Sequence, residues 1–83
     1  MNMPLNEWIN HLMMGREIEF HFKEEAFLLS HIPGTEPLLF SIWNGTKNCE
    51  ICRGTLDCIL NFEFDADRCL NASPDAFSVD YIL

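Results

Sequence analysis

Basic residues are scarce in this 83-residue chain, in which five lysines and arginines stand against thirteen aspartates and glutamates for a net charge of −8. A field of that sign repels the phosphates of nucleic acids and of anionic membranes. We therefore expect neither direct nucleic-acid binding nor membrane binding, and the charge favours a protein partner with a basic surface. Because the acids are spread along the sequence, a simple gain in solubility also explains them.

Long hydrophobic runs are also missing. The longest, LLFSIW and AFLLS, fall far short of the roughly 20 apolar residues needed to cross a bilayer. The segment MNMPLNEWINHLMMG has no basic start and no uninterrupted apolar stretch, so we expect no signal peptide and a cytoplasmic protein. In a reducing compartment, disulfide bonds between the four cysteines are disfavoured.

Motifs for catalysis and cofactor binding are absent as well. The sequence has no glycine-rich phosphate loop, no basic patch with interleaved aromatics and no internal repeat. His11, His21 and His31 have no serine or cysteine placed beside them by local spacing, so we interpret them as surface or strand-end residues. We therefore expect no enzyme and no cofactor.

Hydrophobic residues make up 48% of the chain, which is enough for one packed core and predicts a single domain over residues 1–83. Helical spacing predicts a helix over residues 4–14, with Pro4 in the first turn and Gly15 in a left-handed stop. The expected apolar stripe consists of Leu5, Trp8, Ile9, Leu12 and Met13.

The period then changes from 3.6 to 2, which predicts two strands within GREIEFHFKEEAFLLSHI at residues 15–32. We expect a turn centred on Glu24 and Glu25, with the large apolar residues of both strands on one face. The pairs in this register are Phe22 with Phe27, Phe20 with Leu29, and Ile18 with His31.

Two more strands are predicted over Leu38–Trp43 and Lys47–Cys52. Asn44-Gly45 between them is a strong hairpin signal, and a turn centred there places Cys49 opposite Phe40. The strands then form a four-stranded antiparallel meander, with the N-terminal helix packed on its apolar face.

The segment from residue 55 to residue 64 permits two interpretations, because its apolar residues alternate as in a strand while Thr55 is a good N-cap for a helix. Phe77, Val79 and Tyr81 alternate and indicate a last strand. The expected fold class is therefore α+β: a helix on a four-stranded meander, followed by one or two short helices and a C-terminal strand.

The pattern G-R-E-I-E-F-x-[FY] at residues 15–22, after a short amphipathic helix and before F-x-L at residues 27–29, resembles a family of small uncharacterised proteins from Firmicutes and their mobile elements. Their typical form is EIEFxYxGKxYSI. The resemblance spans the first half of the chain, implies an α+β fold and favours a helix over residues 55–61. It implies no known activity and transfers no binding residue. The chain departs from the family at Glu24-Glu25, where the family has Asn-Gly-like turn residues.

The string CEICRG at residues 49–54 is the most suggestive local motif. Cys49 and Cys52, together with Cys58 and Cys69, would supply the four ligands of a small zinc module. However, the second pair is widely spaced, and Cys49 and Cys52 point to opposite faces if the segment is a strand. Packing of the cysteines in the core is the simpler interpretation, and a redox pair is a third.

Glu17 and Glu19, with the adjacent Glu24 and Glu25, form a candidate acidic face for binding a partner. Strand alternation leaves these carboxylates in solvent, where acid–base catalysis is not expected. We therefore expect a non-enzymatic interaction domain, in its specific form a phage or mobile-element inhibitor that binds a basic, nucleic-acid-binding surface of a host protein. The alternatives are the zinc module and a homodimeric structural protein joined through a strand edge.

Overall fold

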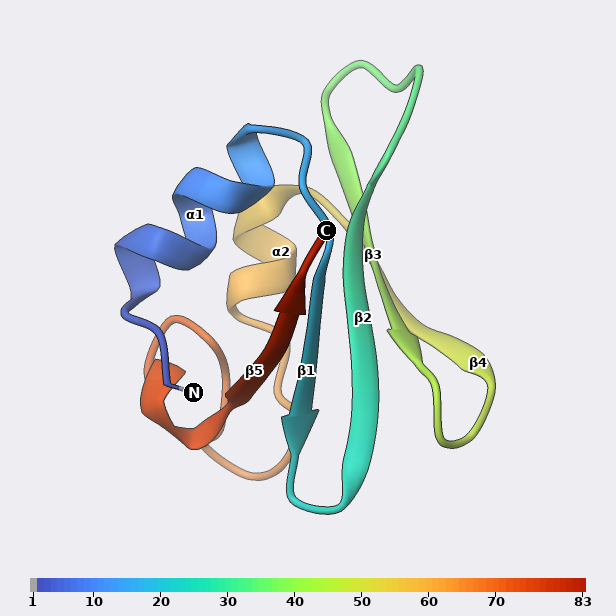
Figure 1. Cartoon of the computed structure of the whole chain (residues 1–83). Coiled ribbons are helices and arrows are strands. Elements are labelled where there is room, and N and C mark those ends of the chain that lie inside the picture. The colour runs from blue at the N-terminus through green and yellow to red at the C-terminus, as the bar shows by residue number, and fades with distance from the viewer. Residues whose placement is uncertain (1) are drawn as a thin grey trace.

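The structure is a computed structural model that describes residues 2–83. Its helices and strands are α1 (Leu5–Met13), β1 (Ile18–Phe22), β2 (Glu25–Ile32), β3 (Leu39–Asn44), β4 (Cys49–Gly54), α2 (Leu56–Leu60), the short 3-10 helix η1 (Pro74–Ala76) and β5 (Ser78–Ile82) (Figure 1). The predicted α+β class is confirmed. Within residues 2–83, no helix is both long enough and apolar enough to cross a membrane.

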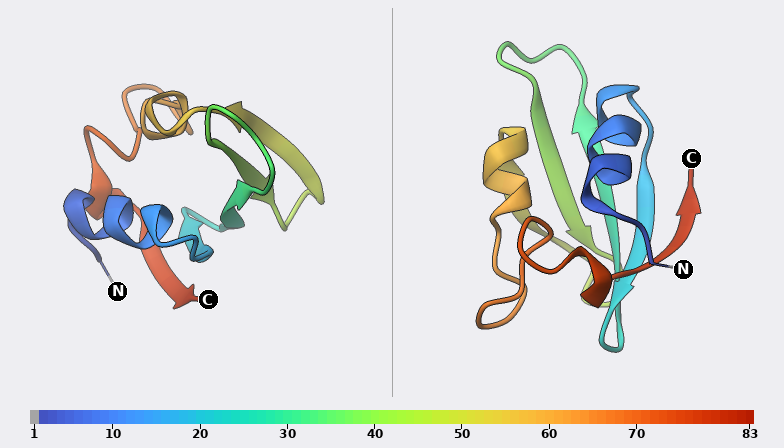
Figure 2. Two further views of the ribbon diagram at one scale, coloured as in Figure 1. Left: turned by 90° about the horizontal axis from the view of Figure 1, so that it is seen from above. Right: turned by 90° about the vertical axis from the view of Figure 1, so that its left-hand side faces the viewer.

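The strands form one antiparallel sheet with the order β4-β3-β2-β1-β5. The first four strands make the predicted meander, and β5 adds a fifth strand beside β1, so that β4 and β5 are the edges. The sheet is strongly curved, and both α1 and α2 lie on its concave side (Figure 2). We call the side toward the helices the inner face and the opposite side the outer face.

Helix α1 follows its amphipathic pattern with one exception. Trp8 and Leu12 are buried, and Gly15 beyond the helix adopts a φ of +79°, as the sequence predicts. Met13, which is predicted on the apolar stripe, is 60% exposed. That prediction is wrong because Met13 lies about 100° around the helix axis from Leu12, outside the buried sector.

The hairpin between β1 and β2 differs in register from the prediction. Lys23 and Glu24 form a two-residue turn, with Lys23 at a φ of +55°. The observed pairs are Phe22 with Glu25, Phe20 with Phe27, and Ile18 with Leu29. The predicted register is wrong by two residues, because the turn is centred one residue earlier in the chain. A two-residue shift preserves alternation, so the large apolar residues still share the inner face.

The hairpin predicted at Asn44-Gly45 is confirmed, but the position of its turn is wrong, because the loop between β3 and β4 spans residues 45–48. Asn44 is buried and holds this loop: its side-chain amide donates to the Glu25 carboxylate at 3.0 Å, and its side-chain oxygen accepts the Lys47 N–H at 2.8 Å. The observed pairs are Asn44 with Cys49 and Phe40 with Gly54, so Cys49 does not lie opposite Phe40.

The ambiguous segment after β4 contains helix α2, which is the alternative that the family resemblance favours. Thr55 caps it, since the Thr55 hydroxyl oxygen accepts the Cys58 N–H at 3.4 Å. Ile59 and Leu60 are buried on the inner side of this helix. The helix ends at Leu60, so the strand-like alternation that continues to residue 64 does not produce a strand.

The predicted last strand is confirmed as β5, but its side chains do not alternate as the sequence suggests. The pairing of β1 with β5 shifts between Glu19 and Phe20, so that Glu19 lies opposite Tyr81 and Phe20 opposite Val79. This bulge makes Asp80 an extra residue, and it reverses the direction of the next side chain. Val79 is therefore buried, whereas Tyr81 is 67% exposed on the outer face.

A cluster of aromatic rings forms the centre of the core between the inner face and the helices. Phe20 is fully buried, and its ring centroid lies between 5.2 and 5.9 Å from four other rings. These neighbours are Trp8, Phe27, Phe64 and Phe77. They come from α1, β2 and the segment between α2 and β5, so Phe20 joins parts of the chain that are distant in sequence.

Because so many rings meet at Phe20, the substitution Phe20→Ala should lower the free energy of unfolding by about 3–5 kcal/mol. Urea unfolding followed by circular dichroism measures this change. Glu24→Gln, in the exposed hairpin turn, is the control and should change the free energy by less than about 0.5 kcal/mol. Equal urea midpoints for the two variants would show that the core is not centred on Phe20.

Candidate functional site

The outer face of the sheet is the surface that no helix covers within residues 2–83, and all five strands contribute to it (Figure 2). None of its side chains is buried. Its residues are Glu19 and His21 of β1; Ala26, Leu28, Ser30 and Ile32 of β2; Leu39, Ser41 and Trp43 of β3; Glu50 and Arg53 of β4; and Ser78, Asp80 and Tyr81 of β5.

One row of this face crosses the whole sheet. Strand register places Tyr81, Glu19, Leu28, Trp43 and Glu50 side by side, in that order from β5 to β4. Trp43 is 40% exposed and Tyr81 67% exposed. Exposed aromatic side chains beside a partly buried leucine are typical of protein–protein contact surfaces, where tryptophan, tyrosine and arginine contribute most of the binding energy.

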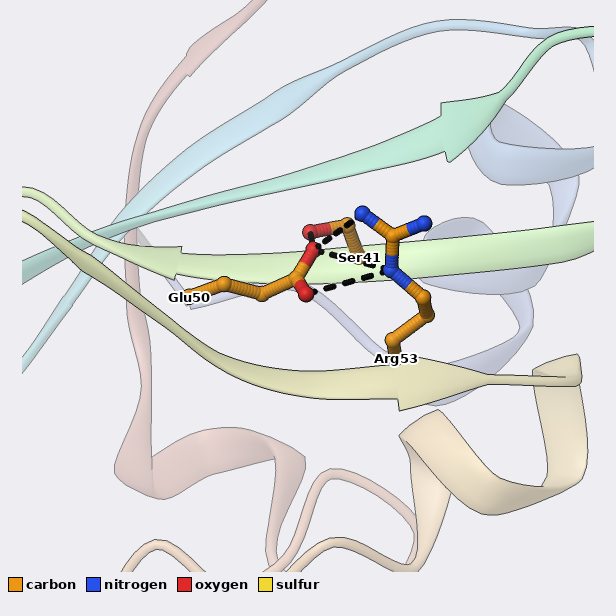
Figure 3. A network of polar contacts seen from close by, with 3 residues as sticks. All are labelled: Ser41, Glu50 and Arg53. Atoms are coloured by element: carbon orange, nitrogen blue, oxygen red, sulfur yellow. Dashed lines mark hydrogen bonds and ion pairs between the residues drawn. The ribbon is translucent and has the colours of Figure 1, made fainter.

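At the β4 end of this row, Glu50 takes part in a local network of polar contacts (Figure 3). The Arg53 guanidinium donates to the Glu50 carboxylate through Nε at 3.1 Å and Nη2 at 3.1 Å, and the Ser41 hydroxyl donates to it at 2.6 Å. The hydrogen bond from Arg53 and then the one from Ser41 hold the pKa of Glu50 below its usual value, and Glu50 raises the pKa of Arg53. Both groups therefore stay charged and neutralise each other.

The β5 end of the row is hollowed. A depression of about 480 Å³ lies over β1, β2 and β5, and its rim carries Glu19, His21, Asp80 and Tyr81. The His21 Nδ1 atom contacts the Asp80 carboxylate across the two strands. No lysine or arginine is among the residues that line this depression. The two ends of the outer face therefore differ. At β4 the Glu50 carboxylate is neutralised by Arg53, whereas at β5 neither lysine nor arginine lines the depression that holds Glu19 and Asp80.

The candidate acidic face is only partly brought together. Glu19 lies on the outer face, and Glu17 directly precedes β1, where its carbonyl oxygen accepts the Leu83 N–H at 2.7 Å. Glu24 is exposed in the hairpin turn. Glu25 instead follows the inner-face alternation of β2, away from Glu19.

The Glu25 carboxylate serves the hairpin loop of β3 and β4. It accepts a hydrogen bond from Asn44, which is the main reason that its pKa lies below the usual value, and Lys47 approaches it at 3.5 Å. A second, smaller hollow of about 190 Å³ lies beside these three residues. Because Glu25 is already paired within the fold, we do not count it in the candidate site.

The four cysteines are free and lie apart from this face. Cys49 and Cys58 are exposed, so the prediction that the cysteines pack in the core is wrong for these two, which sit at the start of β4 and on the solvent side of α2. Burial raises the pKa of the partly buried Cys52 thiol, which disfavours the thiolate that a metal would need. In residues 2–83, no three His, Cys, Asp or Glu side chains are placed to hold a metal ion, so the zinc alternative has no geometric support there.

The histidines lie at separate places. His11 is on α1, where its ring nitrogen Nδ1 lies 3.2 Å from an Arg16 guanidinium nitrogen. His21 is on the outer face, and His31 lies at the end of β2 near Gly15. The structure does not bring the three together.

The outward direction of Tyr81 is not indicated by the sequence. The alternation of Val79 and Tyr81 suggests that both point inward, because a bulge leaves no signal in the residue pattern. Trp43 does carry a signal, since it is out of phase with the buried Phe40 and Ile42 and must therefore point outward. Asp80 also carries a signal, since it is out of phase with Val79 and points outward by simple alternation.

Comparisons of the chain with protein-family models, with curated proteins and with solved structures found no match. Function must therefore be inferred from the chemistry of the outer face.

The Glu50 network predicts a specific pH dependence of stability. Because the pKa of Glu50 is lowered on folding, its stabilising contribution is present above its ordinary value of 4.5 and is lost as the pH falls through the lower folded-state value. Glu50→Gln should therefore lower the thermal midpoint at pH 7, and the difference from the unmodified chain should vanish in acid.

Calorimetric scans of both proteins between neutral and strongly acidic pH measure this difference. Glu24→Gln removes the same charge from an exposed turn and controls for the general effect of one fewer acid. A difference for Glu50→Gln that persists unchanged in acid would contradict the proposed role of the ion pair.

Proposed function

We propose that this chain is a non-enzymatic protein-interaction domain that binds a basic surface of a partner protein through the outer face of its sheet. The observation that carries this proposal is the combination of an uncovered five-stranded face, two exposed aromatic residues on it and a net charge of −8. The aromatic residues supply contact energy. The charge supplies attraction and orientation at long range.

The few basic residues are largely occupied within the fold. Three of the five lysines and arginines form ion pairs, which are Lys23 with Asp65, Lys47 with Glu25 and Arg53 with Glu50. Pairing leaves the net charge unchanged, so the field around the domain stays negative. Such a field raises the association rate with a positively charged surface and disfavours acidic partners.

The specific form of the proposal is an inhibitor, borne by a phage or a mobile element, that occupies a nucleic-acid-binding surface of a host protein. A surface that binds phosphates is basic, and a negatively charged domain competes for it by the same attraction. The resemblance of the first half of the chain to proteins of mobile elements supports this form.

Self-association through a strand edge is the competing proposal. Both β4 and β5 are edge strands, and an exposed edge can pair with a second copy. Two features disfavour it. Each edge strand contains or faces a bulge, which disturbs regular pairing. In addition, two chains of charge −8 repel each other.

Capture of a partner from host lysate tests the proposed function. The immobilised chain should retain a basic protein at about 50 mM salt and release it at about 300 mM, because screening shortens the range of the attraction. The double variant Glu17→Gln/Glu19→Gln should retain much less of that same protein. The matched control Glu7→Gln/Glu63→Gln removes two exposed acids elsewhere and should retain most of it.

Retention that does not respond to salt would contradict an electrostatic interaction. Equal losses in the two double variants would show that total charge matters and that the outer face does not. A captured protein that is acidic, or the absence of any captured protein at both salt concentrations, would contradict the proposed function itself.

A further inference from the structure

The depression at the β5 end of the outer face results from two coincident features. The bulge between β1 and β5 makes Asp80 an extra residue and turns Tyr81 outward. On the other side of β1, His21 pairs with Ala26 of β2, which has the smallest side chain on this face of β2. The outward Tyr81 and the small Ala26 both line a hollow of about 480 Å³, which is within the range of about 300–1,000 Å³ that binding pockets occupy.

The walls of this hollow have a consistent chemistry. Tyr81 pairs with Glu19 across the two strands and both line the hollow, and the Asp80 carboxylate lies beside His21. Lysine and arginine are missing from the lining. An exposed aromatic ring next to carboxylates attracts a cation, because the ring face is negative and the carboxylates pair with the positive charge.

Arginine fits this arrangement better than lysine does. Its guanidinium is planar and weakly hydrated, so it stacks on an aromatic ring while its donors reach a carboxylate in a forked pair of hydrogen bonds. The ammonium of lysine is a compact, strongly hydrated charge that does not stack in this way. A hollow bounded by Tyr81 and Glu19 offers both partners of the guanidinium at once.

The Leu28–Trp43 pair lies beside the hollow in the same row. Neighbouring strands are about 4.8 Å apart, so the centre of this pair is about 7 Å from β1 along the row. Side chains on one face of an extended chain are separated by nearly the same distance, since each residue rises about 3.4 Å. An extended segment can therefore place one side chain in the hollow and the side chain two residues away on Leu28 and Trp43.

We propose that the outer face binds an extended segment of a partner protein, whose arginine enters the hollow over β1, β2 and β5 while an apolar residue two positions away packs on Leu28 and Trp43. This inference rests on the proposed function, and it adds the location and the chemistry of the contact. A second copy of the chain is a poor occupant, because the Glu19 and Asp80 carboxylates of two facing sheets would repel each other.

A short synthetic peptide tests the inference directly. The probe is the capped pentapeptide Ser-Arg-Ser-Leu-Ser, titrated into the full chain labelled with nitrogen-15 and followed by amide chemical shifts. We expect the largest shifts at Glu19, His21, Leu28 and Tyr81. The analogue with citrulline in place of arginine has the same shape without the charge, and it should bind about tenfold more weakly. The lysine analogue should fall between the two.

Variants of the chain locate the binding. Tyr81→Ala and Glu19→Gln should each weaken binding of the arginine peptide several-fold, and Glu63→Gln, at an exposed residue away from the outer face, should leave it unchanged, although it removes the same charge as Glu19→Gln. Tyr81 is an exposed side chain on an edge strand, so its loss should not unfold the chain. The amide spectrum of each variant confirms its fold before the titration.

Several outcomes would overturn the inference. These are equal binding of the citrulline peptide, unchanged binding by Tyr81→Ala, shifts that map to α1 or α2, and no shifts at millimolar peptide. None of them decides the proposed function, which depends on the partner captured from lysate. Sedimentation of the chain alone shows whether it forms a stable dimer, and amide hydrogen exchange shows whether the dimer covers the outer face. A dimer that protects the amides of that face would overturn the inference, because a second copy would take the place of the partner segment.

Discussion

The packing of aromatic rings around Phe20 is the interaction on which the rest of the structure depends. An 83-residue domain has a total stability of about 4–12 kcal/mol, and each well-placed ring pair adds about 0.5–1.5 kcal/mol beyond its burial. A few such contacts therefore amount to a large share of the total. Because the rings come from the sheet, from α1 and from the segment before β5, their packing fixes the sheet against the helices. The inner face therefore packs against the helices and the ring cluster, and no helix covers the outer face.

The shape of the outer face follows from irregularities in pairing. The bulge between β1 and β5 exposes Tyr81 and opens the hollow, and the shift between β3 and β4 lets Glu50 reach both Ser41 and Arg53. Bulges bend and twist a sheet at the point where they occur. Here they give the two ends of one surface different charge properties without any change in the core. The asymmetry of the outer face thus has a local origin in the pairing of the two edge strands.

The sequence alone predicts the fold class, the inner-face residues of β1 and β2, and the positions of most elements, because these depend on apolar periodicity. It does not predict register. Register was decided by the left-handed conformation of Lys23 and by the side-chain contacts of the buried Asn44, neither of which a short sequence pattern reveals. The acidic candidate Glu25 illustrates the consequence, since the earlier turn places it within β2, on the inner face, and not in the hairpin turn. The outward direction of Tyr81 could not be predicted, because it depends on a bulge.

The excess of acidic residues links the stability of the domain to its proposed partner. Like charges repel one another and destabilise the compact state, and this repulsion acts across the surface of a chain with charge −8. The core must therefore supply more stability than the fold would otherwise need. The proposed basic partner would remove part of the repulsion on binding, so association and stability would reinforce each other. The exposed Trp43 and Tyr81 fit the same account, because they are exposed in the chain alone and would become buried under the proposed partner.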